Sequence, residues 1–120
     1  MKLGDIMLID THCHIDSESY ENPNIVIKNM ENNIIVTSAA SPESIDEVIE
    51  LIDKNSNVYG TIGIHPEFAN SYKNEDLKKI ENYLKNPKVV GIAIATRPDC
   101  INEEIAKLHS SMYSLLYFLN

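Results

Sequence analysis

Residues 34–64, IIVTSAASPESIDEVIELIDKNSNVYGTIGI, decide the fold, because they place one helical pattern between two short apolar runs. The runs at 34–40 and 57–64 have the continuous hydrophobic character of strands buried in a parallel sheet. The segment between them begins with Ser41 as a plausible N-cap and Pro42 at the first helical position. A strand, a helix and a strand in this order predict parallel strands joined by a right-handed crossover.

The same alternation extends along the chain in both directions. IMLI (6–9) and KVVGIAIA (88–95) are two further strand candidates, and helical patterns lie at 23–33, 74–86 and 101–120. No Gly-rich phosphate loop follows the first strand, so a nucleotide-binding Rossmann unit is not expected. Barrels of the (βα)8 type typically need about 250 residues. We therefore predict an α/β fold that forms a partial TIM (β/α)8 barrel of about four βα units.

Composition limits the kind of protein this is. The net charge is −8 and the sequence pI is about 4.8, which argues against a basic groove that follows phosphates. A bound divalent cation could still supply positive charge locally. The two cysteines, Cys13 and Cys100, do not make a disulfide scaffold, and neither a secretion signal nor a membrane span is visible. We expect one cytoplasmic domain over residues 1–120 and no membrane partner.

Two histidines stand at the end of the first predicted strand, in LIDTHCHID (8–16). Side chains two residues apart on an extended chain point to the same side, so His12 and His14 should face one way and Cys13 the other. Imidazole suits zinc, iron, manganese or nickel. We predict a metal site at His12 and His14, with Cys13 packed outward under a helix. The alternative is that both histidines are polar surface at a strand end.

A third histidine, His65, follows the third predicted strand in GIHPEF (63–68). Parallel strands bring their carboxyl ends to one edge, so His65 should approach the first pair. Alternatively, His65 caps a loop turn. Asp10 and Asp16 lie on the same alternation face as the first two histidines. Asp10 could orient an imidazole, or either carboxylate could cap a turn.

The motifs IDTHCHID (9–16) and TIGIHPEFA (61–69) together resemble the TatD family of metal-dependent hydrolases, over roughly residues 7–91. The resemblance implies a barrel that binds a divalent metal such as Mg, Mn or Zn and acts as a deoxyribonuclease or related phosphodiesterase on DNA or a small phosphodiester. It implies that His12 and His14 are metal ligands and that His65 lies near the substrate phosphate. The PHP phosphoesterases also open with H-x-H, so a PHP-type enzyme is the alternative.

The sequence departs from that family at its fourth strand. Ile94 stands about where the TatD family has a glutamate that bridges the metals, and we assign no catalytic residue. Residues 88–108 instead resemble a stretch of a radical SAM protein, although the C-x-x-x-C-x-x-C motif of that family is absent and we predict no SAM or iron–sulfur binding. Residues 88–120 are thus atypical for a TatD protein.

Two interpretations of this departure remain open. The chain is either a truncated TatD-like hydrolase with impaired activity, or a non-catalytic half-barrel remnant of a chimeric or disrupted gene. In both cases the open edge of a half barrel predicts self-association.

Overall fold

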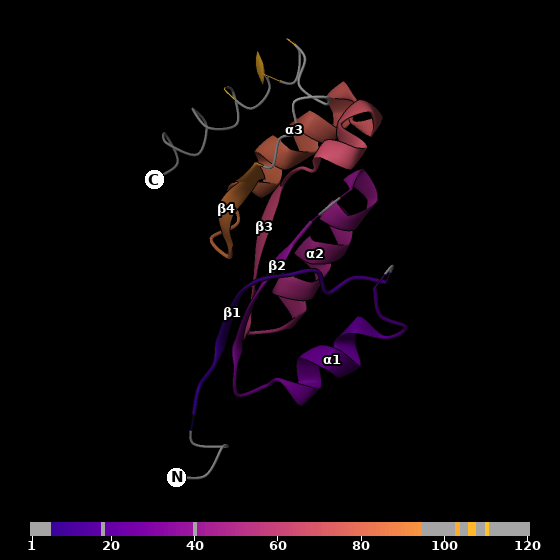
Figure 1. Ribbon diagram of the computed structural model, residues 1–120. Coiled ribbons are helices and arrows are strands. Elements are labelled where there is room, and N and C mark those ends of the chain that lie inside the picture. Colours follow the sequence, from indigo (N-terminus) through magenta and orange to yellow (C-terminus); the bar gives the residue numbers. More distant parts are fainter. Residues whose placement is uncertain are drawn as a thin grey trace.

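The computed structural model describes residues 6–17, 19–39 and 41–94, together with residues 103, 106, 107 and 110. Within these residues four strands form one sheet in the order β1-β2-β3-β4, and each neighbouring pair is parallel (Figure 1). This is the predicted sheet of a partial TIM barrel. The strands are β1 (Ile9–Cys13), β2 (Ile34–Ser38), β3 (Val58–Ile64) and β4 (Val89–Ile94).

Helices alternate with these strands along the chain, as predicted, and pack on one side of the sheet (Figure 1). They are α1 (Pro23–Asn29), α2 (Pro42–Lys54) and α3 (Asn74–Tyr83), with the 3-10 helix η2 (Pro66–Ser71) between β3 and α3. No helix in the described part of the chain is long and apolar enough to cross a membrane.

Helix α2 begins where the sequence predicts it, because Ser41 and Ser44 cap each other. Ser44 N donates to Ser41 Oγ over 3.2 Å, and Ser41 N donates to Ser44 Oγ over 2.9 Å. Pro42 occupies the first turn, where its missing N–H costs nothing. This reciprocal capping box satisfies amide groups that the helix itself leaves unpaired.

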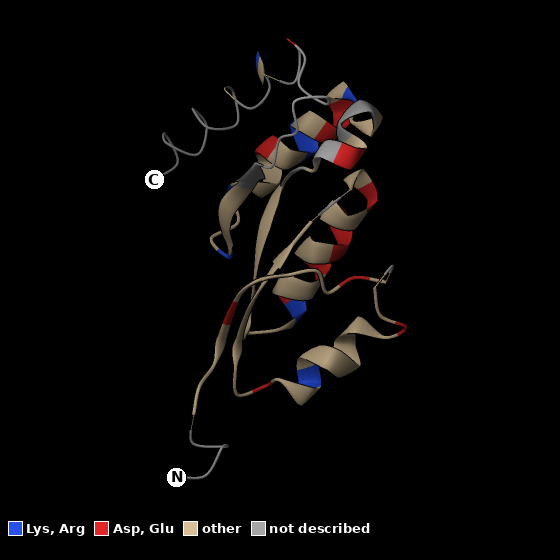
Figure 2. Cartoon of the chain, viewed as in Figure 1, with Lys and Arg blue, Asp and Glu red and all other residues tan. Residues whose placement is uncertain are grey.

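The hydrophobic core lies between the helices and the sheet. Ile35 of β2, Val58 and Ile62 of β3 and Val89 of β4 are buried in it. Charged residues occur mostly on the helices, whereas the strands are largely uncharged (Figure 2). The other face of the sheet, called the opposite face below, carries His12, Ser38 and Thr61. The buried hydrophobic residues of the core are Ile15, Ile27, Ile35, Ala39, Ile45, Val48, Ile49, Leu51, Ile52, Val58, Ile62, Ile80, Leu84 and Val89.

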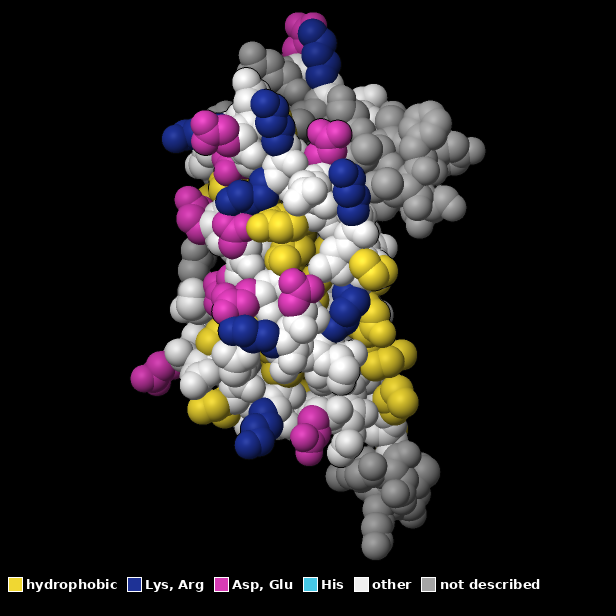
Figure 3. Space-filling view, turned by 180° about the vertical axis from the view of Figure 1, so that it is seen from behind, with side chains coloured by type: hydrophobic (Ala, Val, Ile, Leu, Met, Phe, Trp, Pro, Cys, Tyr) yellow, Lys and Arg dark blue, Asp and Glu magenta, His cyan; other side chains and the backbone are white. Residues whose placement is uncertain are grey.

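One element differs from the prediction. Residues 6–9 were expected to be a buried strand, but β1 begins at Ile9, and Met7, Leu8 and Ile9 are 63%, 63% and 58% exposed. These residues are exposed because β1 is an edge strand of the described sheet and has a neighbouring strand, β2, on one side only. Figure 3 shows a band of hydrophobic side chains along one margin of the molecule. The apolar run therefore lies just before β1, overlaps it only at Ile9, and is not buried.

Several predicted features lie outside the described residues. They include Cys100 and most of the helix expected at 101–120.

Candidate metal centre

His12 and His14 lie together at the carboxyl end of β1. Their ring centroids are 5.0 Å apart, with the rings nearly perpendicular. The residues that alternate with them, Cys13 and Ile15, pack against the core or within it. The two imidazoles thus point to the same side of the strand, as the sequence predicts, and Cys13 points away from them.

Both imidazoles use the same nitrogen for hydrogen bonding within the protein. His14 Nδ1 lies 2.8 Å from the main-chain oxygen of Ser38, and His12 Nδ1 lies 3.2 Å from the Ser38 hydroxyl. No hydrogen bond within the described residues engages the Nε2 atom of either ring. Neutral imidazole binds a metal through one ring nitrogen while the other is hydrogen-bonded. The pair therefore fits a divalent cation on its two Nε2 atoms.

A local irregularity of β1 aims these side chains. Asp10 pairs with Ile35 but Cys13 pairs with Thr37, so β1 contains one more residue than β2 over this stretch. The Asp10 carboxylate accepts a hydrogen bond from His12 N over 3.1 Å inside the irregularity. Such bulges re-aim a side chain at the end of a strand.

Asp10 and Asp16 both serve the main chain in the structure. Asp10 bonds the amide of His12, and Asp16 accepts from Ser19 N over 2.8 Å in the following turn. Of the two alternatives open from the sequence, the structure therefore shows turn capping for Asp16 and a main-chain contact for Asp10, with no carboxylate bond to an imidazole among the described residues.

Cys13 has the environment of a structural cysteine. Its Sγ lies 3.5 Å from the Val36 carbonyl oxygen, to which it donates. Burial, and next the negative charge of Asp10, raise its pKa to about 11, against a smaller lowering by Thr37. The thiolate is the form that binds metals, so a thiol held protonated is a poor ligand.

His65 follows β3 directly and so lies at the same edge of the sheet as the first pair. Its Nδ1 accepts from Glu67 N over 3.3 Å at the start of η2, and its ring is tilted against Phe68, with centroids 6.0 Å apart. Tyr72 donates its hydroxyl to Gly63 O over 2.7 Å, which ties the end of η2 back to β3. The structure shows the turn-capping contact; a role toward a phosphate stays a prediction.

The described residues supply few donors for a metal. They contain no group of three or more His, Cys, Asp or Glu side chains placed to hold one ion. Ile94, the last residue of β4, pairs with Ile64 and brings an aliphatic residue type to the position where the resemblance expects a glutamate. Of three acidic residues that follow β4 in the sequence, Asp99 and Glu104 lie outside the described residues, and Glu103 is exposed. Among the described residues, the two imidazoles of His12 and His14 are therefore the candidate metal ligands.

Two residues of the site were not found from the sequence, Ser38 and Thr61. Their hydroxyl oxygens are 2.7 Å apart on neighbouring strands, and the Ser38 hydroxyl also contacts His12. The sequence pattern that could have identified them is a polar residue within each apolar strand segment, Ser38 in β2 and Thr61 in β3.

This geometry, histidines at the carboxyl ends of parallel strands in a partial barrel, is typical of barrel hydrolases that use metals. A model of the TatD related DNase family matches residues 9–98 of the chain. The chain therefore belongs to the TatD-related DNase family.

Relatives and a solved structure agree with this assignment. An uncharacterized metal-dependent hydrolase of Buchnera aphidicola subsp. Baizongia pistaciae is 36% identical over 94 residues, covering 72% of this chain and 35% of the relative. The uncharacterized metal-dependent hydrolase YabD of Bacillus subtilis (strain 168) is 33% identical over 91 residues, with the same coverage. The crystal structure of YjjV, a TatD homolog from Escherichia coli K12, matches with a TM-score of 0.63 at 18% identity, covering 93% of this chain and 46% of that one.

Two consequences follow. The chain spans about a third of the length of the curated relatives it matches. The family match also continues through β4 to residue 98, so it includes the beginning of the segment that resembles a radical SAM protein. That second resemblance finds no support, and the sequence up to residue 98 is assigned to the TatD-related family.

Proposed function

We propose that this chain provides the first part of a divalent-metal site in a TatD-type hydrolase that cleaves phosphodiester bonds in DNA or a small phosphodiester. In this proposal His12 and His14 hold the metal, Mg, Mn or Zn, and His65 contacts the substrate phosphate. A bound divalent metal polarises a phosphoryl oxygen and lowers the pKa of a bound water.

One observation carries the proposal: the two neighbouring imidazoles both use Nδ1 for a protein contact at Ser38. Each ring then has Nε2 for a shared ligand. Ser38 thus contacts both rings on the side away from Nε2. The names of both relatives as metal-dependent hydrolases support the same reading.

The negative charge of the chain is a second reason to propose a bound metal cation. The chain carries a net charge of −8, and acidic residues occur along α2 and α3 (Figure 2). A phosphodiester would be repelled by this charge unless a cation stood between them. The histidines lie at the carboxyl ends of the strands, where barrel enzymes bind their substrates.

The number of ligands limits what this chain does by itself. Catalytic zinc usually has three protein ligands and one open position, whereas the described residues bring two histidines together and form no cluster of three ligand side chains. We therefore propose weak metal binding and impaired turnover for the 120-residue chain. The competing proposal is a non-catalytic remnant; a PHP-type enzyme is disfavoured by the match to the TatD-related model.

Calorimetric titration of the purified chain with Zn²⁺ or Mn²⁺ tests this proposal. We expect measurable binding that is lost in His12→Ala and in His14→Ala. The matched control is His65→Ala, which should keep the metal affinity because the proposal gives His65 the phosphate rather than the metal. Absence of binding by the unaltered chain, or equal binding by the His12→Ala variant, would overturn the proposal.

A further inference from the structure

Ser38, the last residue of β2, touches both histidines through two different atoms. Its main-chain oxygen lies 2.8 Å from His14 Nδ1, and its hydroxyl lies 3.2 Å from His12 Nδ1. Ser38 as a residue is nearly inaccessible, at 2% exposed. The hydroxyl also lies 2.7 Å from the Thr61 hydroxyl on β3. Contacts therefore run across three neighbouring strands, from β1 through β2 to β3.

We propose that Ser38 is a positioning residue that keeps both imidazoles in the tautomer whose Nε2 lone pair is free for metal, and that Thr61 sets the direction of this hydrogen-bond chain. The inference deepens the function proposed above and rests on it where the metal is concerned. The proposal also predicts which ring nitrogen of His12 and of His14 carries the proton in the metal-free protein.

For His14 the tautomer follows from chemistry alone. A carbonyl oxygen can only accept a hydrogen bond, so the contact with Ser38 O requires a proton on His14 Nδ1. In a neutral imidazole the lone pair is then on Nε2. Because the partner is main chain, no substitution of the Ser38 side chain removes it.

For His12 the tautomer depends on a hydroxyl that can donate or accept. If Ser38 donates its proton to Thr61 Oγ1, its oxygen accepts from His12 Nδ1–H and leaves the His12 Nε2 lone pair free. If Ser38 instead donates to His12 Nδ1, the proton of His12 is on Nε2 and blocks the metal. The 2.7 Å contact has the usual length of an O–H···O bond, in which either hydroxyl can donate. The proposal assigns the donation to Ser38, with Thr61 Oγ1 as acceptor.

The strand register makes this arrangement possible. Ser38 and Thr61 are paired residues of β2 and β3, which places their side chains side by side on the opposite face. The irregularity of β1 at Asp10 and His12 brings the His12 ring to the same row. Partners of this kind orient metal-binding histidines in other proteins, and their loss typically costs about 10–100-fold in metal affinity.

The experiment compares three variants with the unaltered chain. Ser38→Ala removes the hydroxyl but keeps the carbonyl; Thr61→Val keeps the shape but removes the acceptor; Thr61→Ser keeps a hydroxyl and is the conservative control. The first readout is the ¹⁵N NMR tautomer signature of each histidine in metal-free protein, recorded well above the ordinary histidine pKa of about 6.5. The second readout is the Zn²⁺ dissociation constant.

We expect Ser38→Ala and Thr61→Val to move His12 toward the Nε2–H tautomer while His14 keeps Nδ1–H, and Thr61→Ser to behave like the unaltered chain. Zn²⁺ affinity should fall about 10–100-fold in Ser38→Ala. An unchanged His12 tautomer in both Ser38→Ala and Thr61→Val overturns the proposal. If the unaltered chain binds no Zn²⁺, the function proposed above fails, yet the tautomer readout still decides the role of Ser38. If Ser38→Ala does not fold, the matched pair at Thr61 decides it.

Discussion

Gly60 of β3 lies so close to Val48 of α2 that a Cβ atom at Gly60 would be 2.8 Å from Val48 Cγ1. The same atom would be 3.4 Å from Ile52 Cγ2 and 3.6 Å from the Thr37 carbonyl oxygen. Gly60 is therefore the point at which the longest described helix rests directly on the backbone of the sheet. Gly91 lies on the neighbouring strand β4. A Cβ atom there would contact only Thr61 Cγ2, at 3.7 Å, which is an ordinary van der Waals distance.

We expect Gly60→Ala to lower the free energy of unfolding by about 1–3 kcal/mol, because the added methyl group overpacks a filled core. The matched substitution Gly91→Ala should change it by less than about 0.5 kcal/mol. Urea unfolding monitored by circular dichroism measures both. Equal stability of the two variants would contradict the close approach of α2 to β3.

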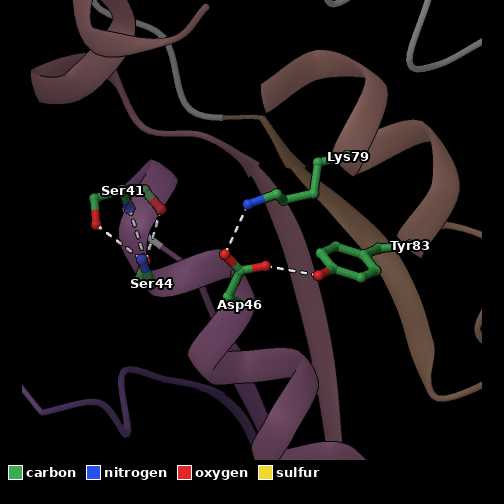
Figure 4. A network of polar contacts seen from close by, with 5 residues as sticks. All are labelled: Ser41, Ser44, Asp46, Lys79 and Tyr83. Atoms are coloured by element: carbon green, nitrogen blue, oxygen red, sulfur yellow. Dashed lines mark hydrogen bonds and ion pairs between the residues drawn. The ribbon is translucent and has the colours of Figure 1, made fainter. Parts of the chain in front are cut away.

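Asp46 links α2 to α3 through two polar contacts (Figure 4). Its carboxylate lies 2.7 Å from Lys79 Nζ and accepts from the Tyr83 hydroxyl over 2.6 Å. Burial raises the pKa of Asp46, but the hydrogen bonds from Lys79 and Tyr83 outweigh it, so the pKa lies below its ordinary value. A carboxyl with a lowered folded-state pKa stabilises the fold above its unfolded-state pKa, about 3.9, and this stabilisation is lost as pH falls through the folded-state pKa.

We therefore expect Asp46→Asn to reduce stability at neutral pH, by less than about 1 kcal/mol because the contact is half exposed. The difference between variant and unaltered chain should shrink as the pH is lowered and vanish once Asp46 is protonated in both states. Thermal unfolding over a pH series checks this, with Glu81→Gln at an exposed residue of α3 as control. A difference that grew toward acid pH would show that the sign is wrong.

How much of this structure the sequence predicts depends on how local each feature is. The alternation of strands and helices and the Ser41 cap come from residues close together in the chain, and both are confirmed. The burial of residues 6–9 was predicted wrongly, because exposure depends on which strands stand beside an element. Ser38 and Thr61 were missed because their contact exists only through the register of β2 on β3, which no short pattern encodes.

Cys13 should react slowly although it lies between two histidines. Its pKa is raised to about 11, so a smaller fraction of it is the reactive thiolate at mildly alkaline pH. In a Cys100→Ser background without metal, we expect modification by a disulfide reagent to be roughly ten-fold or more slower in the folded chain than in urea. Equal rates in the two conditions would mean that the thiol is neither buried nor perturbed.

The hydrophobic margin seen in Figure 3 should lead to association with a second copy of the chain. Leu8 and Ile9 are exposed at one edge of the described sheet, and Val90 is 53% exposed on the strand at its other edge. Pairing β1 of one copy with β4 of another would continue the parallel strand order and cover both edges. We expect sedimentation to show a dimer or larger species.

A matched pair of substitutions tests which surface is responsible for this association. Leu8→Lys should weaken it, whereas Ile25→Lys, at a residue of α1 that is 56% exposed, should not. A monomer that binds no hydrophobic dye would contradict the prediction.

The last prediction concerns catalysis. We expect the purified 120-residue chain to show no appreciable metal-dependent cleavage of DNA. Metal-assisted hydrolysis needs a metal fixed in defined geometry with an open position, and groups placed around it. The described residues offer His12 and His14 but no cluster of three ligand side chains, and β4 ends in Ile94 rather than a carboxylate. Cleavage assays with Mg²⁺, Mn²⁺ or Zn²⁺ check this, with His12→Ala as control. Robust cleavage that disappears in His12→Ala would show that two imidazoles and ligands outside the described residues suffice for turnover.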